Sequence, residues 1–351
     1  MTALTVDQWD GGASLRGRRL PRWSFFAVAA AVLLATWGVF AITPLQGRVD
    51  YFVVAVPAYL AVQTIVAAVV EGGRRAKDRL ATLALGVCFI VALIPLVGVL
   101  GYTIVKGVAR LDPTFLTHSM RSVAEQDANG GAYHAIVGTI EQVGIATLIA
   151  VPIGLLVAIY LVEYSRGRLG RVVSFFVDVM TGLPSIVAGL FIYAFWVLAL
   201  GMGYSGFAGS LALLVLMLPT IVRSAEEVLK LVPNELREAS YALGVPKWRT
   251  IMRVVLPTAI PGIATGIMLA IARVIGETAP LLLTVGFASS INNNPFSGPQ
   301  EGLPLFVFTE SGLPNQTALD RAWAGALTLI IIVMVLSLLA RLVARFARAR
   351  G

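Results

Sequence analysis

The sequence contains little charge and very little cysteine or histidine. Only 13% of its 351 residues are charged, which is about half of the share in ordinary soluble domains. Its one cysteine, Cys88, excludes an internal disulfide framework. The two histidines, His118 and His134, lie too far apart to indicate a local metal pair. The pattern G-x-x-x-x-G-K-[ST], which cradles nucleotide phosphates, is also absent. We therefore expect no ATP-binding site, metal site or cofactor on this chain.

Apolar residues are abundant instead: they make up 58% of the sequence, and the mean hydropathy is +0.84. A soluble fold has too little interior for that much apolar surface, so the composition predicts an integral membrane protein. A spanning helix needs about 20 mostly apolar residues. Eight segments qualify or nearly so, namely 23–42, 51–70, 80–105, 135–162, 172–200, 207–222, 256–287 and 323–342.

Lysine and arginine are placed unevenly between the two sides of the predicted membrane. With the N-terminus inside, 21 of the 27 fall in inside segments, and each inside segment holds at least as many as any outside one. This is the positive-inside pattern of membrane proteins. It predicts that both termini are cytoplasmic. It also accounts for the net charge of +8 without nucleic-acid binding.

Two soluble segments are long: an inner one at 223–255 and an outer one at 288–322. A third, at 106–133, lies outside and has room for a short helix. The inner segment begins a helical pattern after Pro233, places Glu235 and Glu238 early, and turns at Gly244-Val245-Pro246. We expect a short helix, a sharp bend and a helix that re-enters the membrane. From pattern alone, this helix either lies on the bilayer surface or docks another protein.

One arginine, Arg273, falls well inside the seventh predicted span. Glu277 follows four residues later, so the two share a face if the helix is continuous. Glu141, on the fourth span, is expected at a similar depth in the outer half. Charges inside a membrane are costly and usually functional. Arg273 and Glu277 therefore form either a structural ion pair or an anion contact on a transport path.

The inner segment resembles a known family signature. Glu238-Ala239-Ser240, Gly244 and Val254-Val255-Leu256-Pro257 match the spacing of the EAA signature of bacterial ABC importer permeases. Ser240 and Val254 replace an alanine and an isoleucine of that signature. The resemblance implies that this helix couples the permease to an ATPase subunit, through Glu238, Ala239, Ser240 and Gly244.

Three further stretches resemble phosphate permeases of the PstA type: 130–139, 182–191 (G-L-P-S-I-V-A-G-L-F) and 272–280 (A-R-V-I-G-E-T-A-P). The resemblance covers the chain from about Leu80 to its end. It implies a substrate path that includes Arg273, Glu277, Glu141, Thr139 and Ser185. It also implies a second homologous permease, two ATPase (nucleotide-binding) subunits and an extracytoplasmic phosphate-binding protein as partners.

The sequence thus predicts an all-α polytopic protein of the bacterial cytoplasmic membrane with about eight transmembrane helices. Residues 80–351 would form a six-helix importer core of type I, and residues 1–79 a cytoplasmic tail and an extra helical pair. The expected function is a permease subunit for inorganic phosphate, driven by ATP hydrolysis on separate subunits. Alternatives are a permease for sulfate or molybdate, or a self-sufficient secondary transporter or channel.

Overall fold

The computed structural model describes residues 20–21, 23–43, 47–124, 126–127, 129–165 and 167–348, and this part of the chain is helical without a regular strand. Seven of its helices are long and apolar enough to cross a membrane, and a bent pair raises the number to eight. The predicted all-α, polytopic fold is confirmed. The chain forms two compact units, Met1–Leu100 and Gly101–Gly351. The predicted division at residue 79 stays a prediction.

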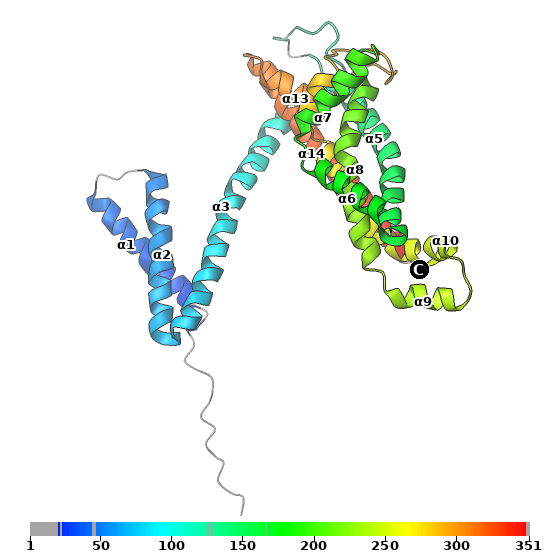
Figure 1. The fold of residues 1–351 in the computed structure, drawn as a ribbon. Coiled ribbons are helices and arrows are strands. Elements are labelled where there is room, and N and C mark those ends of the chain that lie inside the picture. The colour runs from blue at the N-terminus through cyan, green and yellow to red at the C-terminus, as the bar shows by residue number, and fades with distance from the viewer. Residues whose placement is uncertain are drawn as a thin grey trace, which may run out of the picture. The chain divides into compact units, whose positions relative to one another are not determined.

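In the first unit, helices α1 (Ser24–Ile42) and α2 (Arg48–Glu71) run antiparallel before α3 (Gly73–Arg110) begins (Figure 1). At one end the Tyr51 hydroxyl donates to the carbonyl of Leu33, 2.8 Å away. At the other end Glu71 accepts hydrogen bonds from the backbone N–H of Leu20 at 2.6 Å and from Arg79 at 2.8 Å. The carboxylate of Glu71 therefore ties together the start of α1, the end of α2 and the start of α3.

The centre of the second unit consists of α5 (Tyr133–Ile159), α8 (Gly206–Lys230), α11 (Leu256–Val274) and α14 (Gln316–Arg348). Glycines let these helices approach closely. A methyl group at Gly154 of α5 would lie 2.7 Å from Ile221 of α8. Gly262 and Gly266, one turn apart on α11, likewise face α8, where a methyl group would meet side chains at 2.6 Å. The spacing of small residues therefore fixes α8 between α5 and α11.

The predicted span 172–200 is a bent pair rather than one helix. Helix α6 (Arg168–Thr181) ends before Pro184, and α7 (Ser185–Ile192) continues as the π-helix η2 (Tyr193–Ala199). The two arms are bent by 107°. Pro184 cannot continue a helix, and it disfavours helical geometry in the residue before it.

The predicted span 256–287 is also interrupted. Helix α11 ends at Val274, and the short α12 (Ala279–Thr284) begins only after Gly276 and Glu277. The outer segments contain two more helices, α4 (Pro113–Thr117), as expected, and α13 (Leu303–Ser311), which the sequence did not indicate.

The inner segment folds as predicted. Helix α8 ends at Lys230, later than expected, and is followed by the short α9 (Asn234–Ala242). The chain then bends at Gly244, whose φ is +74°. It re-enters through α10 (Lys247–Thr250) and the π-helix η3 (Ile251–Val255), which leads into α11. Figure 1 shows α9 and α10 at the end of this unit that is opposite α13.

Candidate functional site

The α9 segment exposes apolar side chains beside acidic ones. Leu243 is 83% exposed, and Leu236, Tyr241 and Trp248 are exposed as well. Glu238 and Ala239 of the EAA-like stretch point outward too. An exposed apolar patch rimmed by charge is typical of a surface that binds another protein. This exposed face of α9 fits the surface for another protein that the sequence offers as one of its two alternatives.

Ser240 differs from its neighbours because it faces inward. Its hydroxyl lies 2.8 Å from the hydroxyl of Thr250, across the bend between α9 and α10. Gly244 terminates α9 in the left-handed conformation, and its N–H donates to the carbonyl of Tyr241 at 2.9 Å. A methyl group at Gly244 would meet nothing within 4 Å. Ser240 and Gly244 thus shape α9 and the bend after it, whereas Glu238 and Ala239 form the outer surface of α9.

Sequence reasoning missed the residues that attach α9 to the spans. Arg237 of α9 contacts Glu163, which lies in the π-helix η1 (Tyr160–Tyr164) at the inner end of α5. Lys247 of α10 donates to the backbone carbonyl of the same Glu163. Because 74 residues separate Glu163 from Arg237, no local pattern could have paired them. A glutamate at the end of an apolar run was the only available signal.

The structure does not bring Arg273 and Glu277 together as predicted. Helix α11 ends one residue after Arg273, so Glu277 leaves the helical face that the two were expected to share. Arg273 is exposed, and within the described residues it makes no ion pair or hydrogen bond. The structural ion pair, one of the two alternatives for these residues, is not formed within the described part of the chain. The placement of Arg273 on the substrate path stays a prediction.

Glu141 and Thr139 meet the outer segment rather than Arg273. Glu141 accepts a hydrogen bond from the Gln300 side chain at 2.6 Å. Thr139 is only 2% exposed, and its hydroxyl accepts from the N–H of Leu303 at 2.7 Å. Gln142 donates to the carbonyl of Gln300 at 2.8 Å. The outer end of α5 thus holds residues 300–303 and caps the first turn of α13.

Ser185 is the first residue of α7 and is half-buried directly after the bend. One turn later, α7 approaches α12 so closely that a methyl group at Gly189 would lie 2.7 Å from Cα of Pro280. The 182–191 and 272–280 stretches, which carry two of the resemblances, therefore lie side by side.

A buried charged cluster lies beneath the outer segment. Arg321, 1% exposed, bonds to Glu310 at 2.7 Å and to the carbonyl of Asp127 at 2.7 Å. His134 lies 3.5 Å from Glu301. Burial raises the pKa of Glu310, although Arg321 acts in the opposite direction. Glu301 and Glu310 line a cavity of about 350 Å³, and two carboxylates there disfavour an anion.

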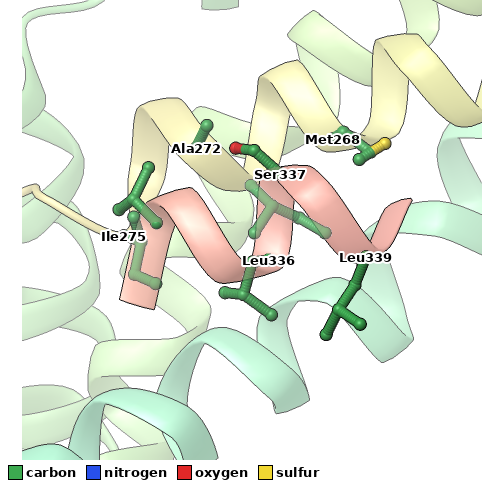
Figure 2. A pocket seen from close by; sticks show the side chains of 8 residues that line it. Met268, Ala272, Ile275, Leu336, Ser337 and Leu339 are labelled. Atoms are coloured by element: carbon green, nitrogen blue, oxygen red, sulfur yellow. The ribbon is translucent and has the colours of Figure 1, made fainter. Parts of the chain in front are cut away.

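A second cavity, of about 260 Å³, lies between α11 and α14. Figure 2 shows Met268 and Ala272 of α11, and Ile275 directly after it, facing Leu336, Ser337 and Leu339 of α14. Among the described residues that line this cavity, Ser337 has the one polar side chain. Since an anion needs several donors or a positive charge, this groove is an apolar helix–helix gap and not a binding site for an anion.

Residues 150–350 match the family described as "Binding-protein-dependent transport system inner membrane component". Over 278 residues the chain is 51% identical to the phosphate transport system permease protein PstA 1 of Mycobacterium tuberculosis (strain CDC 1551 / Oshkosh), which covers 79% of this chain and 91% of the relative. The corresponding PstA of Mycobacterium leprae is 49% identical (79% and 91% covered), and that of Yersinia pestis 39% identical (78% and 92% covered).

Two solved structures share the fold. A bacterial ABC transporter involved in alginate import aligns with a TM-score of 0.54 at 16% identity, covering 78% of this chain and 98% of that one. The inward-facing methionine ABC transporter MetNI aligns with a TM-score of 0.50 at 22% identity, covering 62% and 94%. At these identities the likeness concerns the fold alone.

Proposed function

Because the chain belongs to the family of binding-protein-dependent transport system inner membrane components, we propose that it is the PstA-type permease subunit of a phosphate ABC importer. The observation that carries the proposal is the 51% identity over 278 residues to a phosphate transport system permease. The position of the EAA-like residues on a short helix outside the spans supports it.

A permease of this family works with a partner permease, ATPase subunits and a binding protein. We assign α9, called the docking helix from here on, to the contact with the ATPase, since Glu238, Ala239 and the apolar residues around them are exposed there. Two ATPase subunits would close on ATP binding and open the path outward. Hydrolysis would return it inward, after an extracytoplasmic protein has delivered phosphate.

We assign to Arg273 the contact with phosphate on the substrate path. Its guanidinium matches the geometry of a phosphate, and within the described residues it has no competing carboxylate. Glu277 lies in the stretch 272–280 and Ser185 in the neighbouring stretch 182–191. These two residues would weaken or orient the contact between Arg273 and phosphate. Thr139 and Glu141 act at a distance: they fix the outer segment at residues 300–303.

The test is uptake of labelled phosphate at low external phosphate in cells that lack only this chain, with sulfate and molybdate uptake measured alongside. Selective loss of phosphate uptake is expected, restored by the intact chain. Loss of sulfate or molybdate uptake instead would show that this other anion, and not phosphate, is the substrate. Phosphate uptake that persists in purified vesicles without the ATPase subunits would refute the ABC mechanism.

Arg273→Ala tests the residue assignment in the same cells. It should abolish phosphate uptake while the complex still assembles, and Arg273→Lys should restore part of the uptake because the charge is kept. Loss of assembly with Arg273→Ala would instead assign the residue to packing.

A further inference from the structure

All three nitrogens of the Arg237 guanidinium form contacts, and these contacts link α9 to the inner ends of α5 and α8. Its Nε and Nη2 lie 3.0 and 2.9 Å from Oε1 of Glu163 in η1. Its Nη1 donates to the carbonyl of Val232 at 2.6 Å, and Nη2 donates to that of Leu229 at 3.0 Å, at the inner end of α8. A single side chain of the docking helix therefore contacts the inner ends of both α5 and α8.

Lys247 reaches the same point from the other side of the bend. Its ammonium donates to the backbone carbonyl of Glu163 and lies 4.8 Å from the ring centroid of Tyr164. The Glu163 side chain is only 5% exposed, so water competes little for these contacts. Both helices of the inner segment, α9 and α10, thus meet at one buried carboxylate residue.

The covalent chain gives α9 no connection to α5. Residues 231–233 link α9 to α8, and residues 243–246 link it through α10 to α11. A displacement of α9 therefore reaches α8 and α11 through the chain, whereas it reaches α5 only through side-chain contacts: the packing of α5 on α8 and the direct bonds at Glu163. The outer end of α5 carries Thr139, about 36 Å from Glu163 at helical rise, and Thr139 holds the N–H of Leu303 in the outer segment.

A buried ion pair is a poor source of stability, because apolar residues of the same volume often do as well. What it supplies is a fixed geometry between elements. The segment around Glu163 is a π-helical turn, and so is η3 where α10 joins α11; such turns are frequent at functional sites.

We propose that Glu163, with Arg237 and Lys247, is a joint that transmits the movement of the docking helix to α5 and hence to the outer segment. The joint rests on the proposed function, since it requires an ATPase that moves α9. Glu163, Arg237 and Lys247 are positioning residues in this mechanism and do not contact the substrate.

The test is Glu163→Gln in the complete complex, reconstituted in proteoliposomes with the phosphate-loaded binding protein. The change keeps the size of the side chain and removes its charge. Two quantities are measured: the ATP hydrolysis rate and the phosphate imported per ATP. We expect hydrolysis within about twofold of the unmodified complex, while the phosphate imported per ATP falls about tenfold. Glu163→Asp, which keeps the charge, should import nearly as much phosphate per ATP as the unmodified complex.

Lys230→Gln is the matched control. Lys230 lies at the same end of the unit, its side chain is 61% exposed, and among the described residues its one ion-pair partner is Glu226 of its own helix. It should leave the imported phosphate per ATP unchanged. The proposal would be overturned if Glu163→Gln and Lys230→Gln imported the same amount of phosphate per ATP. It would also be overturned if Glu163→Gln lost hydrolysis and transport in parallel.

If the complex with Glu163→Gln does not assemble, Lys247→Met is tested in its place, since at Glu163 this change removes only the hydrogen bond from Lys247 to the backbone carbonyl. A smaller fall in the same ratio is expected. If neither variant assembles, the contacts are required for folding and the proposal is overturned. The unmodified complex separates the two hypotheses: if it shows no ATP-driven phosphate uptake, the proposed function fails, whatever the variants do.

Discussion

Gly138 of α5 lies where the helix touches the outer segment. A methyl group there would lie less than 3.0 Å from the carbonyl oxygen of Glu301 and 3.1 Å from its carbon. These are backbone atoms, so they cannot move aside as a flexible side chain would. Gly138→Ala must therefore push residues 300–303 away from α5, which lengthens the bonds of Thr139 and Gln142 to that segment.

The magnitude follows from three contributions. Overpacking against a fixed backbone costs about 1–3 kcal/mol, and each of the two buried hydrogen bonds contributes about 1 kcal/mol. The better helix propensity of alanine offsets about 1 kcal/mol. The free energy of unfolding should therefore fall by about 2–4 kcal/mol.

Gly144→Ala is the matched change on the same helix. A methyl group there would meet nothing within 4 Å, so only helix propensity acts, and stability should rise by about 0.5–1 kcal/mol. The assay is thermal unfolding of both variants and the unmodified chain in the same detergent, followed by tryptophan fluorescence. Shifts of the same sign in the two variants would refute the close approach of α5 to Glu301.

Three further predictions concern other parts of the chain. Asp112 caps α4 by accepting the N–H of Phe115 at 2.7 Å, and chiefly this bond lowers the pKa of Asp112 from its ordinary value; Asp112→Ala should cost about 1 kcal/mol at neutral pH. Because the folded-state pKa is lowered, this contribution should be lost as pH falls through it, and equal acid sensitivity of chain and variant in unfolding scans would contradict this. Gly244→Val should reduce the phosphate imported per ATP through backbone strain at φ +74°, whereas Gly244→Asn should be milder because asparagine tolerates this conformation; equal effects would point to another cause. Deletion of residues 1–79 should spare uptake in complemented cells if the six-helix core suffices, and complete loss with normal expression would show that the extra pair is required.

Hydropathy located the membrane segments because span length is set by the bilayer, and proline and glycine located the bend of the inner segment. Both signals are local. The same local reasoning failed at Arg273 and Glu277, because it extended α11 through Gly276, whereas the helix ends at Val274. It also joined α6 and α7 across Pro184, although a proline inside an apolar run was visible in the sequence.

Other parts of the site depend on contacts between distant segments. Thr139 was assigned to the path from a resemblance, and the structure places its hydroxyl on the N–H of Leu303, 164 residues away. Arg321 lies within the predicted outer segment 288–322, yet it is buried against Glu310. Burial of this kind arises from packing in three dimensions, and one sequence without its fold gives no pattern for it.

Many of the long-range polar contacts in this chain end on the main chain. Thr139 and Gln142 bind backbone groups at residues 303 and 300, and Arg237 binds the carbonyls of residues 229 and 232. A backbone group keeps its position when the side chain on that residue changes. These segments are therefore free to accumulate substitutions without losing the contacts. Their length is constrained instead, because inserting or removing one residue would shift every donor and acceptor out of register.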